Sequence, residues 1–240
     1  MSKHEFHYSG AEFEALSQAH NYYRWIRSMF GGRLRGRVVE VGAGRGNFSD
    51  RLLALDAIDE LLLIEPDAQL YQEVTERFEG EGRVTTFEGY FGDHDLGGPV
   101  DAIVLVNVLE HIEDDAALVR TALHALRPGG SLLLFVPAGP RLFGSLDRAF
   151  DHFRRYERRQ LAELLADGGL EVDTAHYVNA PGALIWFLAG RVFRQRTIRL
   201  AQMKLYDRLA IPVISRLETI LRPPRGQSLM AIAVKPGASA

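Results

Sequence analysis

Short apolar runs alternate with longer amphipathic stretches along most of the chain. Five runs of strand length read RVVEV, ELLLIE, RVTTF, DAIVLV and SLLLFV. The stretches between them, residues 46–55, 67–78 and 114–126, have the apolar spacing of helices. Strands that alternate with helices are typical of a parallel sheet covered on both faces. The pattern therefore predicts a three-layer α/β fold.

Further helices and strands are expected before and after these five runs. Residues 1–35 predict a helical lead-in, with apolar positions at Phe13, Leu16, Ala19, Tyr23, Ile26 and Phe30. Beyond the fifth strand we expect a helix near 157–167, a strand near 170–177, a helical insertion at about 180–222 and a last strand in SLMAIAVK. We interpret residues 1–240 as one domain, with a core at 36–137 and a second half at 138–240 that carries the insertion as a cap.

The amino-acid composition and the distribution of charge limit the kinds of site and partner that the protein can have. The chain has no cysteine, which excludes disulfides, thiol catalysis and cysteine-based zinc sites. Charge is unevenly distributed: residues 1–146 carry 13 basic and 22 acidic groups, whereas residues 147–240 carry 15 and 9. A basic, apolar last third suits an anionic acceptor or a membrane surface, or a helical surface that balances the acidic half. The polar N-terminus has no apolar segment like that of a signal peptide, so we expect a cytoplasmic protein.

The stretch VVEVGAGRGNF is the most informative one. A strand ends at Val41, and Gly42, Gly44 and Gly46 form a turn into a helix. Glycines there let the backbone turn tightly and let a ligand approach without meeting a Cβ atom. Such a loop alone is also typical of a nicotinamide-dependent oxidoreductase, or of a plain tight turn. The dinucleotide fingerprint, however, has a small residue at the position that Asn47 occupies.

Two acidic residues sharpen this interpretation. Glu40 lies inside the first strand, where a charge is costly unless it has a partner such as an ammonium group. Glu65 ends the second strand, where a carboxylate can reach the hydroxyls of a ribose bound over the glycine loop. Both acids therefore favour a nucleoside-containing ligand with a cationic group.

Four stretches in order, VVEVGAGRG, LLLIEPD, DAIVLVNVLEHIEDD and LRPGGSLLLFVP, resemble the motifs of class I S-adenosylmethionine-dependent methyltransferases, of the ubiquinone-biosynthesis-like small-molecule type. The resemblance covers residues 36–137. It implies a Rossmann-like sandwich with a mostly parallel seven-stranded sheet, an antiparallel last strand, S-adenosylmethionine as cofactor and S-adenosylhomocysteine as product. The implied cofactor-binding residues are Glu40, Gly42, Ala43, Gly44, Glu65, Pro66, Asn107 and Val108. The first four would hold the methionine end, Glu65 the ribose, Pro66 the adenine and the last two the sulfonium.

His111, in LEHIEDD, follows the fourth strand at the reactive end of the cofactor. With an ordinary pKa of about 6.5 it could accept a proton. It could equally hold the loop before the helix that Asp114 is expected to cap. HIEDD also contains potential metal ligands, but adjacent acids at a helix start are typical of caps, and we expect no metal.

The stretch DRAFDHFRRYERRQL, residues 147–161, is dense in polar groups. His152 and Tyr156 lie four residues apart, so in a helix they would share a face, and either could act as a base. Arg154 and Arg155 could bind a carboxylate or phosphate of the acceptor. The alternative is ordinary structural pairing. This segment, the later YVNAPG and the ending PPRGQSL are also similar to those of a subset of bacterial methyltransferases.

The resemblance implies methyl transfer from S-adenosylmethionine to a small-molecule or lipid- or glycan-linked acceptor, with oxygen as the expected acceptor atom. The alternatives are a catalytically inactive scaffold that binds S-adenosylmethionine and a nicotinamide-dependent oxidoreductase. Nucleic acid is not expected as a partner, because the balance of charge is acidic and the fourth strand ends in NVLE instead of an NPPY-type motif. The 180–222 region suits an amphiphilic acceptor, a homodimer, or peripheral contact with the inner membrane face.

Overall fold

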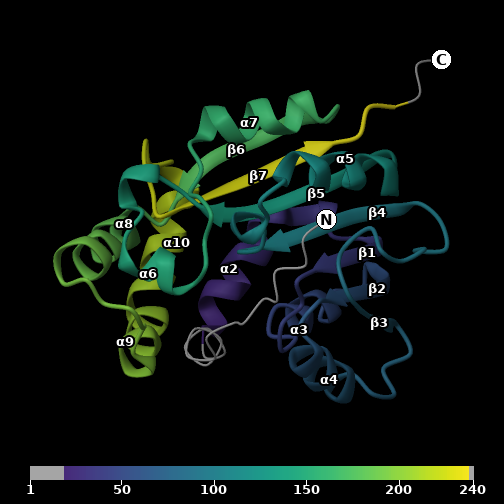
Figure 1. The fold of residues 1–240 in the computed structure, drawn as a ribbon, viewed down its shortest axis with the longest axis horizontal. Coiled ribbons are helices and arrows are strands. Elements are labelled where there is room, and N and C mark those ends of the chain that lie inside the picture. The colour runs from purple at the N-terminus through teal and green to yellow at the C-terminus, as the bar shows by residue number, and fades with distance from the viewer. Residues whose placement is uncertain (1–18, 238–240) are drawn as a thin grey trace.

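The computed structural model describes residues 19–237, and its centre is a seven-stranded sheet in the order β3-β2-β1-β4-β5-β7-β6 (Figure 1). β7 is antiparallel to both of its neighbours, and the other neighbouring pairs are parallel. The predicted sheet with an antiparallel last strand is thus confirmed. The strands are β1 (Gly36–Val41), β2 (Ile58–Glu65), β3 (Val84–Glu88), β4 (Val100–Val106), β5 (Leu126–Pro137), β6 (Glu171–Val178) and β7 (Ser228–Val234).

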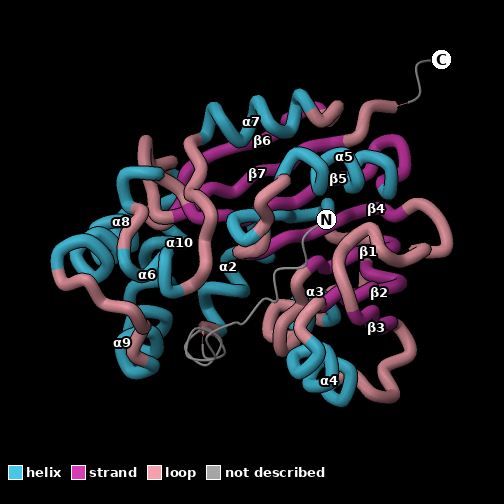
Figure 2. The backbone as a smooth tube through the Cα atoms, in the orientation of Figure 1, coloured by secondary structure: helices cyan, strands magenta, loops and turns pink. Residues whose placement is uncertain are grey.

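Helices cover both faces of the sheet, as Figure 2 shows. Alternate residues of a strand point to opposite faces: in β2, Leu61 and Leu63 join one apolar cluster, and Leu62 and Ile64 join the other. The first cluster includes side chains of α2 (His20–Phe30), α3 (Ser49–Leu53), α4 (Ala68–Arg77) and α10 (Ile211–Ile220). The second includes side chains of α5 (Asp115–Ala125) and α7 (Arg158–Asp167).

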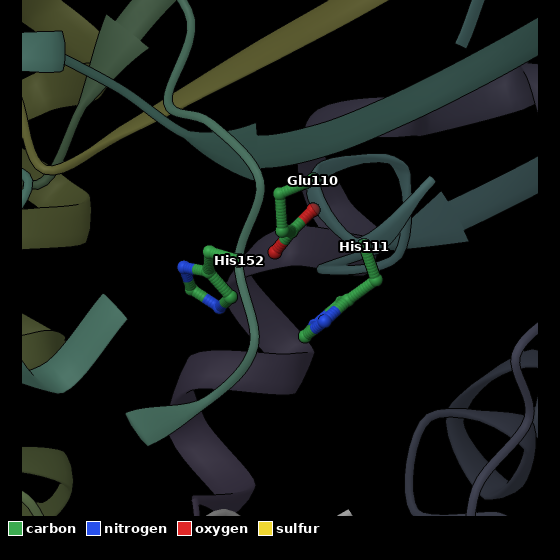
Figure 3. Close-up of side chains that lie close together, drawn as sticks. All are labelled: Glu110, His111 and His152. Atoms are coloured by element: carbon green, nitrogen blue, oxygen red, sulfur yellow. The ribbon is translucent and has the colours of Figure 1, made fainter. Parts of the chain in front are cut away.

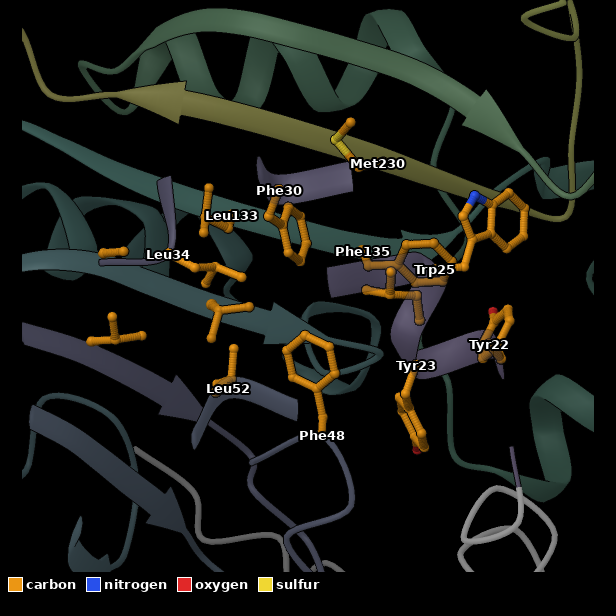
Figure 4. Packing of buried hydrophobic residues seen from close by; sticks show 14 of the residues in the cluster. Tyr22, Tyr23, Trp25, Phe30, Leu34, Phe48, Leu52, Leu133, Phe135 and Met230 are labelled. Atoms are coloured by element: carbon orange, nitrogen blue, oxygen red, sulfur yellow. The ribbon is translucent and has the colours of Figure 1, made fainter. Parts of the chain in front are cut away.

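The lead-in helix α2 packs an aromatic face onto the sheet (Figure 4). The ring of Tyr22 meets that of Phe135 edge-on at 5.7 Å between centroids. The expected apolar positions Ala19, Tyr23, Ile26 and Phe30 are all buried, whereas Phe13 and Leu16 lie outside the described residues. The lead-in therefore ties the N-terminal part of the described chain to the first face of the sheet.

The insertion before β7 is helical, as expected, and is interrupted by two π-helical turns. It comprises α8 (Ala180–Phe187), a π-helix at Leu188–Val192, α9 (Leu200–Leu205), a second π-helix at Tyr206–Ala210, and α10. In Figure 1 these helices gather at one end of the molecule, beside the short helix α6 (Ser145–Ala149). The chain between α6 and α7 is a turn followed by irregular backbone, so His152 and Tyr156 do not lie on a helix.

Candidate active site

The glycine turn after β1 has the backbone geometry that its sequence predicts. Gly42, Gly44 and Gly46 all have positive φ angles, of 72°, 55° and 78°. A Cβ atom on Gly42 would lie 2.6 Å from the Cγ2 atom of Val108. Because L-residues rarely adopt these angles and the space beside Gly42 is filled, the turn requires glycine. The loop thus keeps its backbone open to a ligand at the end of β1.

Glu40 is buried in β1, directly beneath this turn. Its carboxylate accepts a hydrogen bond from the Ser49 hydroxyl at 2.6 Å, and its residue surface is only 4% exposed. Burial raises the pKa of Glu40 to about 8, although the Ser49 hydrogen bond opposes the shift. Among residues 19–237 no basic side chain forms an ion pair with it. A cationic group of a ligand would supply the missing charge.

Glu65, at the end of β2, holds the glycine turn. One carboxylate oxygen accepts the Gly44 N–H at 2.7 Å, and the other accepts the Asp67 N–H at 3.0 Å. Burial raises the pKa of Glu65 to about 7, and the two backbone hydrogen bonds oppose the shift. The second expected acid therefore lies against the loop, where the sequence places it.

A cavity joins these groups at the carboxyl ends of the central strands. Its walls are formed by Tyr23, Glu40, Gly42, Ala43, Gly44, Arg45, Asn47, Phe48, Glu65, Val106, Asn107, Val108 and His111. An open α/β sheet binds its ligands at this edge, where the strand order reverses between β1 and β4. Seven of the eight expected cofactor residues line the cavity, and Pro66 lies outside its walls. The open glycine loop and two buried acids without a cation fit the methionine and ribose groups of S-adenosylmethionine.

Several of these wall residues were not predicted from the sequence. Tyr23 and Phe48 close the cavity from α2 and from the turn before α3. The sequence pattern gave Tyr23 as an ordinary apolar position on a helix face, and nothing in its spacing set it apart from the others.

Asn107 has a left-handed backbone, with φ of 54°, and its N–H donates to the Phe135 carbonyl at 2.8 Å. This bend turns the chain across the cavity as β4 ends.

His111 and His152 meet beside the cavity, together with Glu110 (Figure 3). The two imidazole rings are 4.8 Å apart and nearly perpendicular, at 83°. Burial lowers the pKa of His111 to about 3, with His152 lowering it further and a hydrogen bond to the Asp151 backbone opposing the shift. His111 is therefore neutral at physiological pH. The structure brings together two of the three expected catalytic residues, which are 41 positions apart in sequence.

Glu110, His111 and His152 each offer an atom that could bind a metal, and these atoms lie within 4.8 Å of one another. All three residues belong to types that bind zinc or other divalent transition metals. A metal ion at this point would lie beside the cavity wall. The expectation that the protein uses no metal stays a prediction.

Asp147 is the hub of the polar cluster at residues 147–161. It is fully buried and accepts hydrogen bonds from His152 Nδ1 at 3.1 Å, Arg155 Nε at 2.6 Å and Trp186 Nε1 at 3.1 Å. Burial by itself would raise the pKa of Asp147, but the His152 hydrogen bond and the Arg155 guanidinium lower it to about 2. The ring of Trp186 also lies 4.7 Å from the Arg155 guanidinium. An ionised Asp147 thus links the cap helix α8 to His152.

Tyr156 and Arg154 face away from this hub. Tyr156 is fully buried, and its hydroxyl hydrogen bonds with the Asp115 carboxylate at 2.9 Å and the Leu109 carbonyl at 3.2 Å. Burial and Asp115 raise the pKa of Tyr156 well above its ordinary value. Arg154 forms an ion pair with the same Asp115 at 2.9 Å. The structure therefore does not bring Tyr156 together with His111 and His152, and Tyr156 does not line the cavity.

Comparison with known proteins identifies the family of the chain. The methyltransferase domain family matches residues 14–175, more than half of the chain. A "Probable S-adenosylmethionine-dependent methyltransferase" of Mycolicibacterium smegmatis is 30% identical over 145 residues, 59% of this chain and 54% of that protein. A ubiquinone biosynthesis O-methyltransferase of Xylella fastidiosa is 31% identical over 105 residues, 41% of this chain and 40% of that protein. The chain thus spans about half the length of these relatives.

A solved structure has the same fold at lower sequence identity. An S-adenosylmethionine-dependent methyltransferase of Mesorhizobium loti superposes with a TM-score of 0.60 at 15% identity, over 88% of this chain and 95% of that one. The expected Rossmann-like fold is confirmed by this likeness and by the strand order. With the family match and the four motifs in place, the chain belongs to the methyltransferase domain family, in its class I S-adenosylmethionine-dependent form.

Proposed function

We propose that this protein transfers a methyl group from S-adenosylmethionine to an oxygen atom of a small-molecule or lipid- or glycan-linked acceptor. The observation that carries the proposal is the cavity between the glycine turn and His111, which has two buried acids at one end and, at the other, His111 with the His152 ring packed behind it. When bound, S-adenosylmethionine supplies an electrophilic methyl group on a sulfonium. Glu40 would bind its ammonium group, and Glu65 would bind its ribose hydroxyls.

An alcohol or phenol acceptor arrives protonated, so methyl transfer to its oxygen needs a base, and we assign that role to His152. Asp147 accepts a hydrogen bond at Nδ1 of His152, which places the proton of the neutral ring on that nitrogen. Nε2 then carries the lone pair, and it has no hydrogen-bond partner among the described residues. As the acceptor oxygen forms its bond to the methyl carbon, Nε2 would take the hydroxyl proton. Asp147 would stabilise the resulting imidazolium.

His111 is the weaker candidate for this role, although it lines the cavity. Its lowered pKa of about 3 makes it a poor base at neutral pH. A neutral His111 could instead position the acceptor against the methyl group, and in-line placement supplies much of the rate of such a displacement. Tyr156 has its hydroxyl engaged by Asp115 and Leu109.

The test is to measure release of S-adenosylhomocysteine with phenol and alcohol acceptors, including lipid-linked ones. We expect acceptor-dependent release that His152→Ala lowers at least 100-fold in kcat with cofactor affinity unchanged, since general bases typically contribute 10²–10⁴-fold. His124→Ala, which changes an exposed histidine of α5, is the matched control. EDTA should leave turnover unchanged if no metal takes part.

Three results would contradict the proposal in different ways. Loss of turnover in Tyr156→Phe, with His152→Ala active, would move the base to Tyr156. Binding of S-adenosylmethionine without release in the presence of any acceptor would favour the inactive scaffold. Methylation of amine acceptors only would exclude oxygen as the acceptor atom.

A further inference from the structure

Exposed apolar side chains are concentrated in one part of the molecule. Among the described residues, twelve of the fourteen large hydrophobic side chains that are exposed lie between Leu184 and Leu221. The most exposed are Ile220 at 82%, Leu221 at 70% and Phe193 at 68%. They belong to α8, α10, the segments between them and Leu221 just after α10, which gather at one end of the molecule (Figure 1). Exposed apolar residues in such number are typical of a surface that meets another surface.

The charged side chains of the same region are almost all basic. Residues 180–222 contain eight basic residues, and every one is exposed: Arg191, Arg194, Arg196, Arg199, Lys204, Arg208, Arg216 and Arg222. Their two acids are engaged in internal hydrogen bonds. Asp207 is buried and accepts the N–H groups of Asn21 and Tyr22, and Glu218 accepts those of Asn179 and Ala180. The exposed charge of this region is therefore positive.

A cavity of about 550 Å³ opens beside this region, between α6 and the loop that follows α8 and its π-helix. It is lined by Ser145, Arg148, Ala149, Arg194 and Arg196. None of the three arginines forms an ion pair with a described residue. The Ser145 hydroxyl donates to the backbone carbonyl groups of Gly190 and Gln195, which fixes the loop against α6. Three guanidinium groups without an internal counter-ion are suited to bind phosphate.

We propose that residues 184–222 and Arg148, here called the docking surface, bind the surface of an anionic lipid bilayer. Apolar side chains such as Phe193 and Ile220 would enter the boundary between headgroups and acyl chains. The basic residues would contact anionic headgroups, and the arginine cavity would take a lipid phosphate. No helix in residues 19–237 is long and apolar enough to cross a bilayer, so the contact we propose is peripheral.

Charge and apolar character favour a bilayer over two other occupants of the docking surface, a second copy of the chain and a nucleic acid. A second copy docked on the same surface would oppose two sets of eight exposed positive charges, which repel each other. Nucleic acid would match the charge but would offer no apolar layer for the exposed aliphatic side chains. An anionic bilayer matches both the charge and the apolar side chains.

Docking would bring the bilayer close to the candidate active site. Trp186 of α8 donates to Asp147, and Asp147 accepts a hydrogen bond from His152 beside the cofactor cavity. One buried carboxylate therefore connects the docking surface to the reactive end of the cavity. This connection suits an acceptor held in or on the membrane, although the docking surface does not depend on the proposed methyl transfer.

The test is flotation of the purified full chain with vesicles of phosphatidylcholine alone or with 30% phosphatidylglycerol, about one lipid in three, in low and high salt. We expect binding to the anionic vesicles that falls steeply as salt screens the charges. Each basic residue near an anionic surface contributes about a five-fold gain in partition. Arg194→Glu with Arg196→Glu should therefore lower binding at least ten-fold. Phe193→Ser with Ile220→Ser should lower it at both salt concentrations.

The matched control is Arg120→Glu with Arg158→Glu, which reverses two exposed charges on α5 and α7, outside the docking surface. It should bind vesicles like the wild type. Thermal unfolding of each variant shows whether it is folded. An equal loss of vesicle binding in the control variant, or equal binding of the wild type to both kinds of vesicle, would overturn the proposal. So would a concentration-dependent dimer that Phe193→Ser abolishes, or binding of RNA, in the absence of vesicle binding.

Discussion

At the scale of single residues, the site depends on two carboxyl groups that burial makes hard to ionise. Glu40 and Glu65 are 4% and 2% exposed, and burial raises their pKa values to about 8 and about 7. Neither has an ion-pair partner among the described residues. Near neutral pH Glu40 is therefore mainly protonated and Glu65 about half protonated, until a cation approaches them. A cationic ligand should therefore change their protonation when it binds.

This gives a prediction with a definite sign. At pH 6.5, below both pKa values, Glu40 is mainly protonated in the free protein, and an ammonium group beside it would lower its pKa. We expect binding of S-adenosylmethionine to release protons at pH 6.5 and to tighten as the pH rises toward 8. Calorimetry in two buffers of different ionisation enthalpy measures the release. Identical heats in both buffers, or protons taken up, would contradict the role given to Glu40, and Glu40→Gln should show less release.

Residues such as Glu40 and Glu65 could be predicted from sequence because their positions follow from local pattern. Each lies in or at the end of a strand that an apolar run defines, and Glu40 stands two residues before the first glycine of the tight turn. Tyr156 could not be placed in this way. Its partner Asp115 is 41 residues earlier, and the segment that carries Tyr156 is irregular where a helix was considered.

At the scale of elements, the segment between α6 and α7 is held by tertiary contacts instead of by its own periodicity. Asp151 has a left-handed backbone, with φ of 55°, which ends the α6 turn and directs His152 toward His111. Asp147 fixes the segment through partners 5, 8 and 39 residues away. Hydrophobic spacing carries no information about these contacts. The conformation of the polar segment between α6 and α7 could therefore not be predicted from the sequence.

The Asp147–Arg155 pair should be one of the strongest determinants of stability in this half. Arg155→Ala would leave a buried carboxylate without its cation, which typically costs about 3 kcal/mol. We expect a clear fall in the urea midpoint of unfolding, measured by circular dichroism. Arg159→Ala is the control, because Arg159 pairs with Glu163 on the exposed face of α7 and solvent screens that pair. Similar midpoints for the two variants would show that the buried pair contributes little.

At the scale of the whole molecule, the alternation of strands and helices predicted a sheet covered on both faces, and the family resemblance implied its antiparallel last strand. The strand order then places the carboxyl ends of β1, β2 and β4 at one edge, where the cofactor cavity lies. The cap was expected to be helical, and its π-helical turns at 188–192 and 206–210 were not. Those turns depend on how the helices of the cap pack, and the spacing of apolar residues along the sequence gives no information about that packing.

The most direct test of the central claim is calorimetric titration of the full chain with S-adenosylmethionine and, separately, with NAD. The account predicts micromolar binding of S-adenosylmethionine and none of NAD. Glu65→Ala should weaken the binding at least ten-fold, or about 1.4 kcal/mol, and Asp59→Ala, at the opposite end of β2, should leave it unchanged. Folded protein that binds NAD instead, or a Glu65→Ala variant with wild-type affinity, would contradict the assignment of the cavity to this cofactor.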